Sequence, residues 1–243
     1  MFIASDTDIG KKRSENQDRV HAEFLADNVA VAVVCDGMGG ASSGGVASQL
    51  AIDAVVKRIK ENFRKDMKPN SIRNLMPTSV HYANTIVYGK SKEDIDKNGM
   101  GTTCVAALVV DKTVYMVSVG DSRGYLLTKD GIAQITTDHT YVEMLYRSGQ
   151  ITKEEAKKNH HMRNVITKAV GVESDVEVDY FELEENDNFA VLLCSDGLTN
   201  YCTDNMIYET VFGNNLDEAI KQLIAFANEC GGKDNITAAV IAN

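Results

Sequence analysis

Apolar residues follow two repeating patterns along the chain, one typical of buried strands and one typical of amphipathic helices. Short apolar runs between turn residues predict strands over residues 28–35, 104–110, 113–119, 124–127, 132–135, 189–194 and 236–242. Asp111-Lys112 separates two of these runs and Lys129-Asp130-Gly131 another two, which predicts two hairpins. Because hairpins dominate, the strand pairing is expected to be mostly antiparallel.

Longer segments repeat their apolar residues every three or four positions, as one face of a helix does. This period predicts a long helix over residues 46–63, a second over 72–88 and a third over 216–227. Pro77 is expected to break or kink the second helix, because proline lacks an amide proton and clashes with the preceding turn. Helices with one apolar face need a sheet to cover, which predicts sheets with helices outside them.

Residues 139–169 do not fit either pattern. This segment is polar, contains only short helical pieces and interrupts the succession of strands. The chain has only two prolines and no linker rich in Ser and Gly. We therefore interpret residues 1–243 as a single domain with an insertion at about 139–169.

Composition narrows the possible functions and locations. The formal net charge of −10 argues against a nucleic-acid partner, because the chain would repel phosphate backbones. No apolar run is long enough to span a membrane, and residues 1–12 lack the order of a signal peptide. A cytoplasmic location is therefore expected. The five cysteines contain no C-x-x-C pair and are interpreted as small buried side chains.

Aspartates stand at the ends of several predicted strands. Asp36, Asp121 and Asp196 follow apolar runs, Asp234 precedes the last run, and Asp18 precedes a short apolar alternation. Each aspartate alone can be explained as a turn residue. Together, carboxylates at neighbouring strand ends would repel one another unless a cation lay among them. Clustered oxygen ligands are typical of Mg²⁺ and Mn²⁺, so the pattern predicts a site for two metal ions.

Arg13 adds a second cationic group near this site in the sequence. A guanidinium can clamp two phosphate oxygens at once. The basic run 11–13 alone would be a solvated loop, but it lies close to Asp18. None of the five histidines has the spacing of a zinc site. Two metals that share carboxylates can deprotonate water and stabilise charge on a phosphoryl group, so the residues favour phosphate ester hydrolysis.

Six short motifs carry a resemblance to a known family. They are Arg13-x-x-Asn16-Gln17-Asp18, Asp36-Gly37-Met38-Gly39-Gly40, Gly101-Thr102-Thr103, Gly120-Asp121-Ser122-Arg123, Ser195-Asp196-Gly197-Leu198 and Gly232-x-Asp234-Asn235-Ile236-Thr237. The set resembles the bacterial-type metal-dependent protein phosphatases, the PPM or protein phosphatase 2C family. The motifs occur in the family's order over nearly the whole chain, which makes the match specific.

The resemblance implies an α+β fold in four layers, an α-β-β-α sandwich of two mostly antiparallel sheets flanked by helices. It implies a protein serine/threonine phosphatase that needs two divalent metal ions, Mn²⁺ or Mg²⁺. Hydroxide bridging the metals would attack the phosphorus of phosphoserine or phosphothreonine directly. Phosphorylated proteins would be the substrates, and the enzyme would reverse the action of a bacterial Ser/Thr kinase. Nothing in the sequence demands more than a monomer.

The same resemblance implies roles for individual residues. Asp36 would bridge the two metals, and the Gly37 carbonyl would bind one of them. Three further carboxylates would surround the second metal: Asp18, Asp196 and Asp234. Asp121 would share a weaker third metal site with Asp196. Arg13 would hold the substrate phosphate, and the insertion at 139–169 would be the flap that influences substrate choice.

The chain departs from the family at the proton donor for the leaving group. Met38 replaces a histidine of animal members, and Ala41 replaces a histidine found in some bacterial members. A metal-bound water is our first candidate for the donor. Flap histidines are the second candidates: His139, His160 and His161. Gln17 replaces a glutamate of some relatives, while the neighbouring Asp18 keeps a carboxylate there.

Two other functions remain as alternatives at this point. A binding module that has lost catalysis would lack some of the metal-site aspartates, but all five are present. A two-metal phosphoesterase could act on small molecules or nucleic acids instead of proteins. The negative charge argues against nucleic acids, and the family resemblance argues against both substrates.

Overall fold

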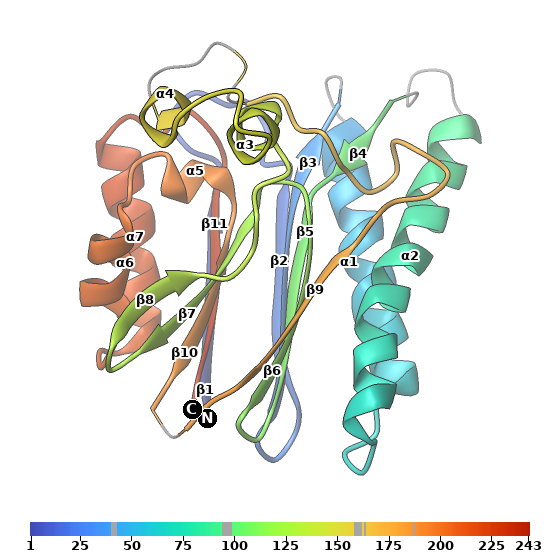
Figure 1. Ribbon diagram of the computed structural model, residues 1–243, viewed down its shortest axis with the longest axis vertical. Helices are drawn as coiled ribbons and strands as arrows, with labels where there is room; N and C mark the ends of the chain where they lie inside the picture. Colours follow the sequence, from blue (N-terminus) through green and yellow to red (C-terminus); the bar gives the residue numbers. More distant parts are fainter. Residues whose placement is uncertain (40–42, 94–98, 158–161, 163, 187) are drawn as a thin grey trace.

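The computed structural model describes residues 1–39, 43–93, 99–157, 162, 164–186 and 188–243 (Figure 1). Two sheets lie face to face, and a pair of helices covers the outer face of each sheet. The expected four-layer α-β-β-α sandwich is therefore confirmed. No helix in these residues is long and apolar enough to cross a membrane.

Each sheet is antiparallel throughout its described strands. The first has the order β1 (Phe2–Asp8), β11 (Ile236–Ala242), β10 (Ala190–Cys194), β7 (Arg123–Thr128) and β8 (Gly131–Gln134). The second has the order β2 (Asp18–Ala26), β3 (Val29–Met38), β5 (Cys104–Val110), β6 (Thr113–Val119) and β9 (Asp179–Glu184), with β4 (Gly101–Thr102) paired to the end of β3. Both predicted hairpins are present.

The helices fall into three groups. Two long helices cover the second sheet: α1 (Ser43–Asn62) and α2 (Pro69–Glu93). Three helices belong to the side of the first sheet: α5 (Asp196–Thr199), α6 (Asp204–Val211) and α7 (Leu216–Glu229). Two short helices form the insertion between β8 and β9: α3 (Tyr141–Arg147) and α4 (Lys153–Lys157). The short helical pieces expected in 139–169 are thus confirmed.

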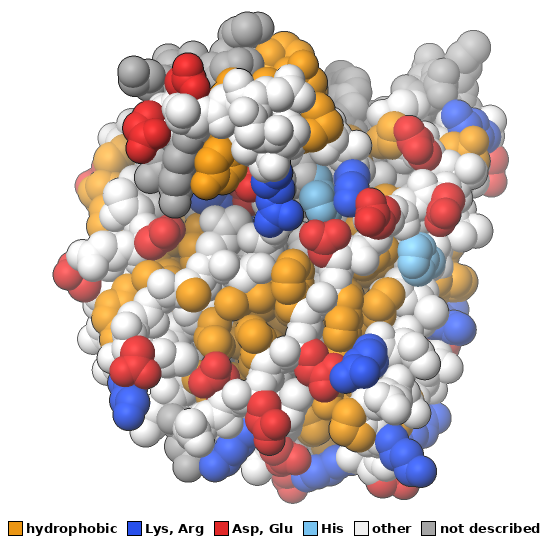
Figure 2. Space-filling view, viewed as in Figure 1, with side chains coloured by type: hydrophobic (Ala, Val, Ile, Leu, Met, Phe, Trp, Pro, Cys, Tyr) orange, Lys and Arg blue, Asp and Glu red, His pale blue; other side chains and the backbone are white. Residues whose placement is uncertain are grey.

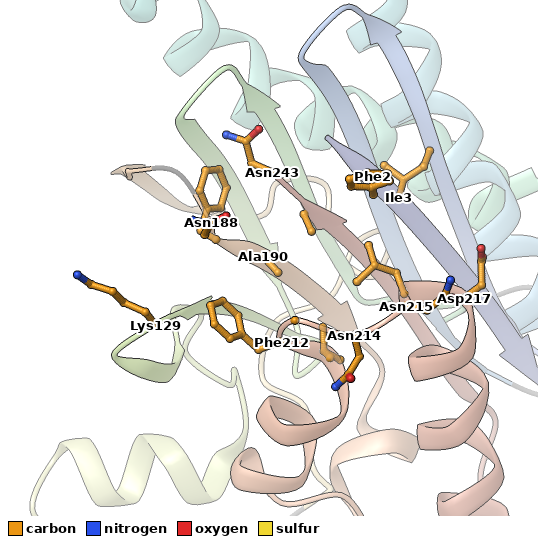
Figure 3. A pocket seen from close by; sticks show the side chains of 15 residues that line it. Phe2, Ile3, Lys129, Asn188, Ala190, Phe212, Asn214, Asn215, Asp217 and Asn243 are labelled. Carbon is orange, nitrogen blue, oxygen red and sulfur yellow. The ribbon is translucent and has the colours of Figure 1, made fainter.

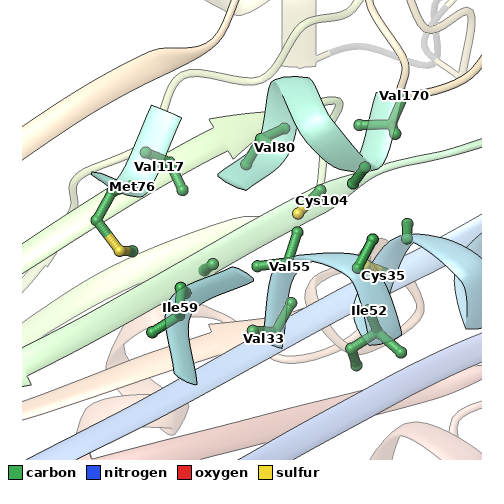
Figure 4. Close-up of a cluster of buried hydrophobic side chains, with 14 of the residues drawn as sticks. Val33, Cys35, Ile52, Val55, Ile59, Met76, Val80, Cys104, Val117 and Val170 are labelled. Carbon is green, nitrogen blue, oxygen red and sulfur yellow. The ribbon is translucent and has the colours of Figure 1, made fainter. Parts of the chain in front are cut away.

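Strands that are buried on both faces explain the continuous apolar runs. In β3, Val31 and Val33 pack toward α1 and α2, whereas Ala32 and Val34 pack into the layer between the two sheets. Figure 4 shows the first of these layers, where Val33 lies near Val55 of α1. Alternate residues thus serve two different apolar layers, so no position in the middle of the strand is polar.

The layer between the sheets reaches the surface at one edge. β8 and β9 are the last strands of their sheets, and both lie toward the viewer in Figure 1. Partly buried Ile135, Phe181 and Leu183 pack against the inner layer. Seen from this side, hydrophobic side chains form a band across the middle of the face, with charged side chains around it (Figure 2).

The structure corrects one expectation about α2. The predicted break at Pro77 is wrong, because α2 continues as one helix through this residue. Proline at position 77 removes the hydrogen bond to the carbonyl of Arg73, one turn earlier. Arg73 lies on the exposed side of the helix, where water can bind that carbonyl instead. The apolar face of α2 stays buried, and its packing holds the helix together.

Four strands were absent from the sequence-based expectations, namely β1, β2, β4 and β9. Three of them are edge strands: β1, β2 and β9. Their side chains are mostly half-buried and include several charged residues, so no continuous apolar run marks them. The fourth strand has only two residues, which is too short for any periodic pattern.

We expect Pro77→Ala to stabilise the protein by about 1–3 kcal/mol, because alanine restores the amide donor in the middle of α2. Urea unfolding of both proteins measures the difference. Pro69→Ala is the matched control, because Pro69 is the first residue of the same helix, where a proline costs little. A loss of stability in Pro77→Ala would mean that packing of the proline ring outweighs the missing hydrogen bond.

Candidate active site

Five elements bring the predicted carboxylates to one end of the sandwich. Asp18 begins β2, Asp36 lies near the end of β3, Asp121 follows β6, Asp196 begins α5, and Asp234 precedes β11. Asp18 and Asp36 are direct partners across the β2–β3 pair. The other four carboxylates all raise the pKa of Asp36 through their charges. We call these five residues the carboxylate cluster.

Burial and mutual repulsion dominate the electrostatics of the cluster. Asp18 is only 1% exposed, and burial raises its pKa to about 6. Asp121 is 8% exposed, and burial raises its pKa to about 7, with a further contribution from Asp196. Burial, and then the charge of Asp18, raises the pKa of Asp36 well above its usual range. The cluster is therefore costly to ionise unless a cation accompanies it.

Hydrogen bonds on both sides of the chain hold the backbone of Asp36. Its N–H donates to Thr103 Oγ1 at 2.9 Å. Its carbonyl accepts from the Thr103 N–H at 2.9 Å and from Thr102 Oγ1 at 2.9 Å. The Gly-Thr-Thr motif thus fixes the main chain at Asp36, so the direction of its side chain is set by the backbone.

Gly37 lies where the chain has no room for a side chain. A Cβ atom at this position would overlap the Gly44 carbonyl in the first turn of α1 and lie 2.7 Å from the Gln17 carbonyl. A Cβ on Gly44 would in turn lie 2.7 Å from the Gly37 carbonyl oxygen. Two glycines in contact therefore let α1 begin directly beside the carbonyl that was predicted to bind a metal.

One oxygen of Asp18 has hydrogen-bond partners and the other has none. Oδ2 accepts from Ser195 Oγ and from Thr237 Oγ1, each at 2.7 Å. Oδ1 is buried and has no hydrogen-bond partner among the residues that the structure describes. An unpaired buried carboxylate oxygen is costly, and a bound cation would remove that cost.

These donors fit divalent metal ions, although the side chains alone do not complete a site. Among the described residues, no three His, Cys, Asp or Glu side chains already converge as the ligands of one ion would. Mg²⁺ and Mn²⁺ commonly take carbonyl oxygens and water as well as carboxylates. The unpaired Asp18 oxygen, the mutually repelling charges and the Gly37 carbonyl together suit such ions.

Arg13 lies at the cluster, with its guanidinium on Asp234. Nε is 2.8 Å from Oδ1 and Nη2 is 2.8 Å from Oδ2, so the pair is bidentate. The hydrogen bond with Asp234 raises the pKa of Arg13, and the charges of Asp36 and Asp196 add to the effect. The Arg13 side chain remains 53% exposed and open to solvent. It can therefore meet a ligand that approaches from outside.

Asn235 is a site residue to which the sequence analysis assigned no role. Its Oδ1 accepts from the Gln17 N–H at 2.8 Å, and its Nδ2 donates to the carbonyls of Ile9 and Glu15 at 2.9 and 3.0 Å. The residue is 5% exposed. Arg13 lies in the loop between Ile9 and Gln17. The Asn235 side chain binds both ends of this loop and so holds it beside the start of β11.

A polar pocket of about 630 Å³ opens beside Asp121 and Asp196. Its other wall includes Glu143, Tyr146 and Arg147 of α3, so the insertion at 139–169 borders the cluster. A second pocket of about 610 Å³ lies at the ends of β1, β10 and β11 and is mainly apolar (Figure 3). None of the five carboxylates lines the second pocket, so it is separate from the candidate site.

Arg123 and His139, two further residues near the polar pocket, are already engaged in hydrogen bonds or ion pairs. Arg123 forms a bidentate pair with Asp138, with Nε 3.0 Å from Oδ1 and Nη2 2.6 Å from Oδ2. His139 is 7% exposed, accepts the Gly120 N–H on Nδ1 at 3.0 Å, and has Nε2 3.2 Å from Asp179 Oδ2. Both ring nitrogens are used, which argues against His139 as a proton donor. His160 and His161 lie outside the described residues.

The raised pKa values predict an inverse dependence of stability on pH in the metal-free protein. Asp18 and Asp121 bind protons more tightly when folded than in the unfolded chain, where aspartate titrates near about 3.9. Stability should therefore fall by about 2–5 kcal/mol between about pH 4 and pH 7 in the presence of a chelator. Urea unfolding at several pH values measures the change.

Asp121→Asn should reduce this pH dependence, because the amide does not titrate. Saturating Mn²⁺ at neutral pH should restore the lost stability. A chelated protein whose stability rises steadily over the same pH range would contradict the prediction.

Comparisons with known proteins place this geometry in a family. The family model described as Protein phosphatase 2C matches residues 10–239. The serine/threonine phosphatase stp of Listeria monocytogenes is 38% identical over 242 residues, which cover 99% of this chain and 95% of the relative. Protein phosphatase PhpP of Streptococcus pneumoniae is 31% identical, with 100% and 97% of the two chains covered.

Solved structures agree with this assignment. The serine/threonine phosphatase Stp1 of Staphylococcus aureus matches with a TM-score of 0.90 and 36% identity, covering 99% of this chain and 94% of its own. The catalytic domain of the phosphatase PstP, in complex with two manganese ions, matches with a TM-score of 0.83 and 32% identity over 98% and 96% of the chains. The expected resemblance is therefore confirmed, and this chain belongs to the protein phosphatase 2C family.

Proposed function

We propose that this protein hydrolyses phosphoserine and phosphothreonine in protein substrates with the help of two divalent metal ions held by the carboxylate cluster. The observation that supports this most directly is the buried, unpaired oxygen of Asp18 among carboxylates that repel one another. The Listeria relative is named a serine/threonine phosphatase and the Streptococcus relative a protein phosphatase, which supports this reaction and substrate class.

The proposed metal ligands are the side chains of the cluster and one carbonyl. They are Asp18, Asp36, Asp121, Asp196, Asp234 and the backbone oxygen of Gly37. Asp36 lies centrally, since every other carboxylate of the cluster acts on its charge. When bound, such ions activate water at neutral pH and neutralise charge on the phosphoryl group. Mn²⁺ is our first choice, because a similar phosphatase is described with two manganese ions.

Arg13 is proposed to bind the substrate phosphate. Its guanidinium forms a bidentate contact with the two carboxylate oxygens of Asp234. An arginine can bind two oxygens of a phosphate in the same bidentate way. If Asp234 turns to a metal, the guanidinium loses this partner and can take two oxygens of the phosphoryl group instead. Asn235 keeps the Arg13 loop beside the cluster while this exchange occurs.

The polar pocket is proposed to hold the protein chain next to the phosphorylated residue. It begins at Asp121 and Asp196 and extends to α3, where Tyr146 and Arg147 can contact a peptide. Because His139 has both nitrogens engaged, we propose that water in the site supplies the proton for the leaving serine or threonine oxygen.

We further propose that the enzyme acts as a monomer in the cytoplasm and reverses the action of a Ser/Thr kinase. The negative net charge supports protein rather than nucleic-acid substrates. Within the described residues, the absence of a helix that could cross a membrane is compatible with this location.

A phosphatase assay with two substrates tests the proposed function. We expect a phosphothreonine peptide to be hydrolysed in Mn²⁺, a nucleotide to be hydrolysed far more slowly, and excess chelator to abolish both reactions. Asp36→Asn should reduce the rate by at least about a hundredfold, because it weakens the central carboxylate of the site.

Asp53→Asn provides the control, since Asp53 lies on the exposed side of α1, where it accepts a hydrogen bond from Gln49 Nε2 one turn earlier in the same helix. It should retain the activity of the wild-type protein. Preference for the nucleotide would favour a small-molecule phosphoesterase, and unchanged activity in chelator would contradict the metal requirement.

Arg13→Ala should mainly raise KM for the phosphopeptide, by about tenfold, because Arg13 binds the phosphate in both the ground state and the transition state. Steady-state kinetics at saturating Mn²⁺ measures KM and kcat separately. Arg13→Lys should recover only part of the affinity, since an ammonium cannot form the bidentate contact. An unchanged KM with a large fall in kcat would instead place the interaction in the transition state alone.

A further inference from the structure

A closed set of hydrogen bonds surrounds the side chain of Asp18. Asn16 Nδ2 donates to Thr7 Oγ1 at 2.9 Å, and Thr7 Oγ1 lies 2.6 Å from Thr237 Oγ1. Thr237 Oγ1 donates to Asp18 Oδ2 at 2.7 Å. The Asp18 N–H donates to Asn16 Oδ1 at 3.0 Å, which closes the set. We call these four residues the hydroxyl ring: Thr7, Asn16, Asp18 and Thr237.

The direction of every bond in the hydroxyl ring follows from the protons available. An ionised carboxylate can only accept hydrogen bonds, so Thr237 must donate its single hydroxyl proton to Asp18. In its contact with Thr7, Thr237 therefore accepts and Thr7 donates. The Thr7 oxygen then receives the amide proton of Asn16. All the bonds point the same way around the ring, which lets each bond strengthen the next.

Ser195, which lies between the end of β10 and the start of α5, completes the arrangement. Its N–H donates to the Thr237 carbonyl at 3.0 Å, while the Thr237 N–H donates to Ser195 Oγ at 3.1 Å. The Ser195 carbonyl accepts instead from Leu198, in the turn that opens α5. The Ser195 hydroxyl oxygen thus takes the place of the Ser195 carbonyl as acceptor for the Thr237 N–H. The same hydroxyl donates its proton to Asp18 Oδ2.

Both hydroxyl donors bind the same oxygen of Asp18. Oδ2 accepts hydrogen bonds from Ser195 and Thr237, whereas Oδ1 is buried and has no hydrogen-bond partner within the described part of the chain. The surrounding residues Ser195 and Thr237 are themselves fully buried, so water does not compete for these bonds. The carboxylate is therefore held in one rotation, with a single oxygen left for a ligand.

We infer that Thr237, Ser195 and Thr7 are positioning residues that orient Asp18 so that Oδ1 faces a metal ion. This inference rests on the proposed function, because it assumes that the cluster holds divalent ions. Groups that orient a metal ligand commonly change metal affinity by about 10- to 100-fold when they are removed. Thr7 acts through Thr237, which links β1 to the site across 230 positions in the sequence.

Thr237→Val is the direct test, because valine keeps the shape of threonine but has no hydroxyl. We expect this variant to bind Mn²⁺ about tenfold more weakly in isothermal titration calorimetry. Thr237→Ser keeps the hydroxyl and should bind Mn²⁺ within about twofold of the wild-type protein. Circular dichroism and thermal unfolding in chelator establish that each variant is folded before titration.

Ser79→Ala controls for the loss of a buried hydroxyl elsewhere. Ser79 Oγ donates to the Leu75 carbonyl inside α2, an element that carries none of the five carboxylates. Its thermal stability should change, while its Mn²⁺ affinity should remain that of the wild type. If Thr237 served stability alone, Thr237→Val would likewise change thermal stability and keep the Mn²⁺ affinity of the wild type. That outcome would overturn the inference.

Thr7→Val gives a second, independent measurement that leaves both donors to Asp18 in place. We expect about a threefold loss of Mn²⁺ affinity, smaller than for Thr237→Val because the contact is indirect. If Thr237→Val does not fold, the test depends on Thr7→Val. Wild-type Mn²⁺ affinity in Thr7→Val would then overturn the inference. A wild-type protein that binds no Mn²⁺ would overturn the proposed function as well, whereas unchanged variants of a Mn²⁺-binding enzyme would overturn only the positioning role.

Discussion

Repulsion among clustered carboxylates, two of them buried and three half-buried, is the constraint on which the rest of this structure depends. Five acidic side chains meet at one end of the sandwich, and burial raises the pKa of Asp18, Asp36 and Asp121. Such a cluster would separate if its members lay on mobile loops. Each member instead stands at the end of an element whose other residues are buried in one of three apolar layers. Burial of these layers supplies the stability that keeps the charges together.

Backbone contacts transmit this rigidity from the core to the site. Thr102 and Thr103 hold the main chain of Asp36, and the contact between Gly37 and Gly44 lets α1 begin beside it. Asn235 ties the Arg13 loop to β11. The hydrogen bonds of Thr102, Thr103 and Asn235 satisfy backbone donors and acceptors that would otherwise be unpaired at the strand ends. The family motifs thus fix the backbone at the strand ends, in addition to supplying the carboxylates of the cluster.

The negative net charge of the protein is compatible with a phosphate substrate because charge is arranged locally. Arg13 stands at the cluster and is half exposed, whereas Arg123 is committed to Asp138. The proposed metals would add positive charge only where the carboxylates converge. Away from that point the acidic surface favours solubility and discourages nucleic acids. The chain shares its fold with the Stp1 phosphatase at a TM-score of 0.90, and side chains of α3 border the polar pocket beside the cluster.

The sequence by itself determined the buried strands, the long helices and the aspartates at their ends, because periodicity and turn chemistry act between near neighbours. It did not predict the half-buried edge strands β1 and β9, or that α2 continues through Pro77, since packing of distant residues outweighs local preference there. Only the tertiary structure decided that Arg13 pairs with Asp234 and that Thr7 bonds to Thr237. Those contacts join opposite ends of the chain, and no pattern within a single segment encodes which distant side chain will complete a hydrogen bond.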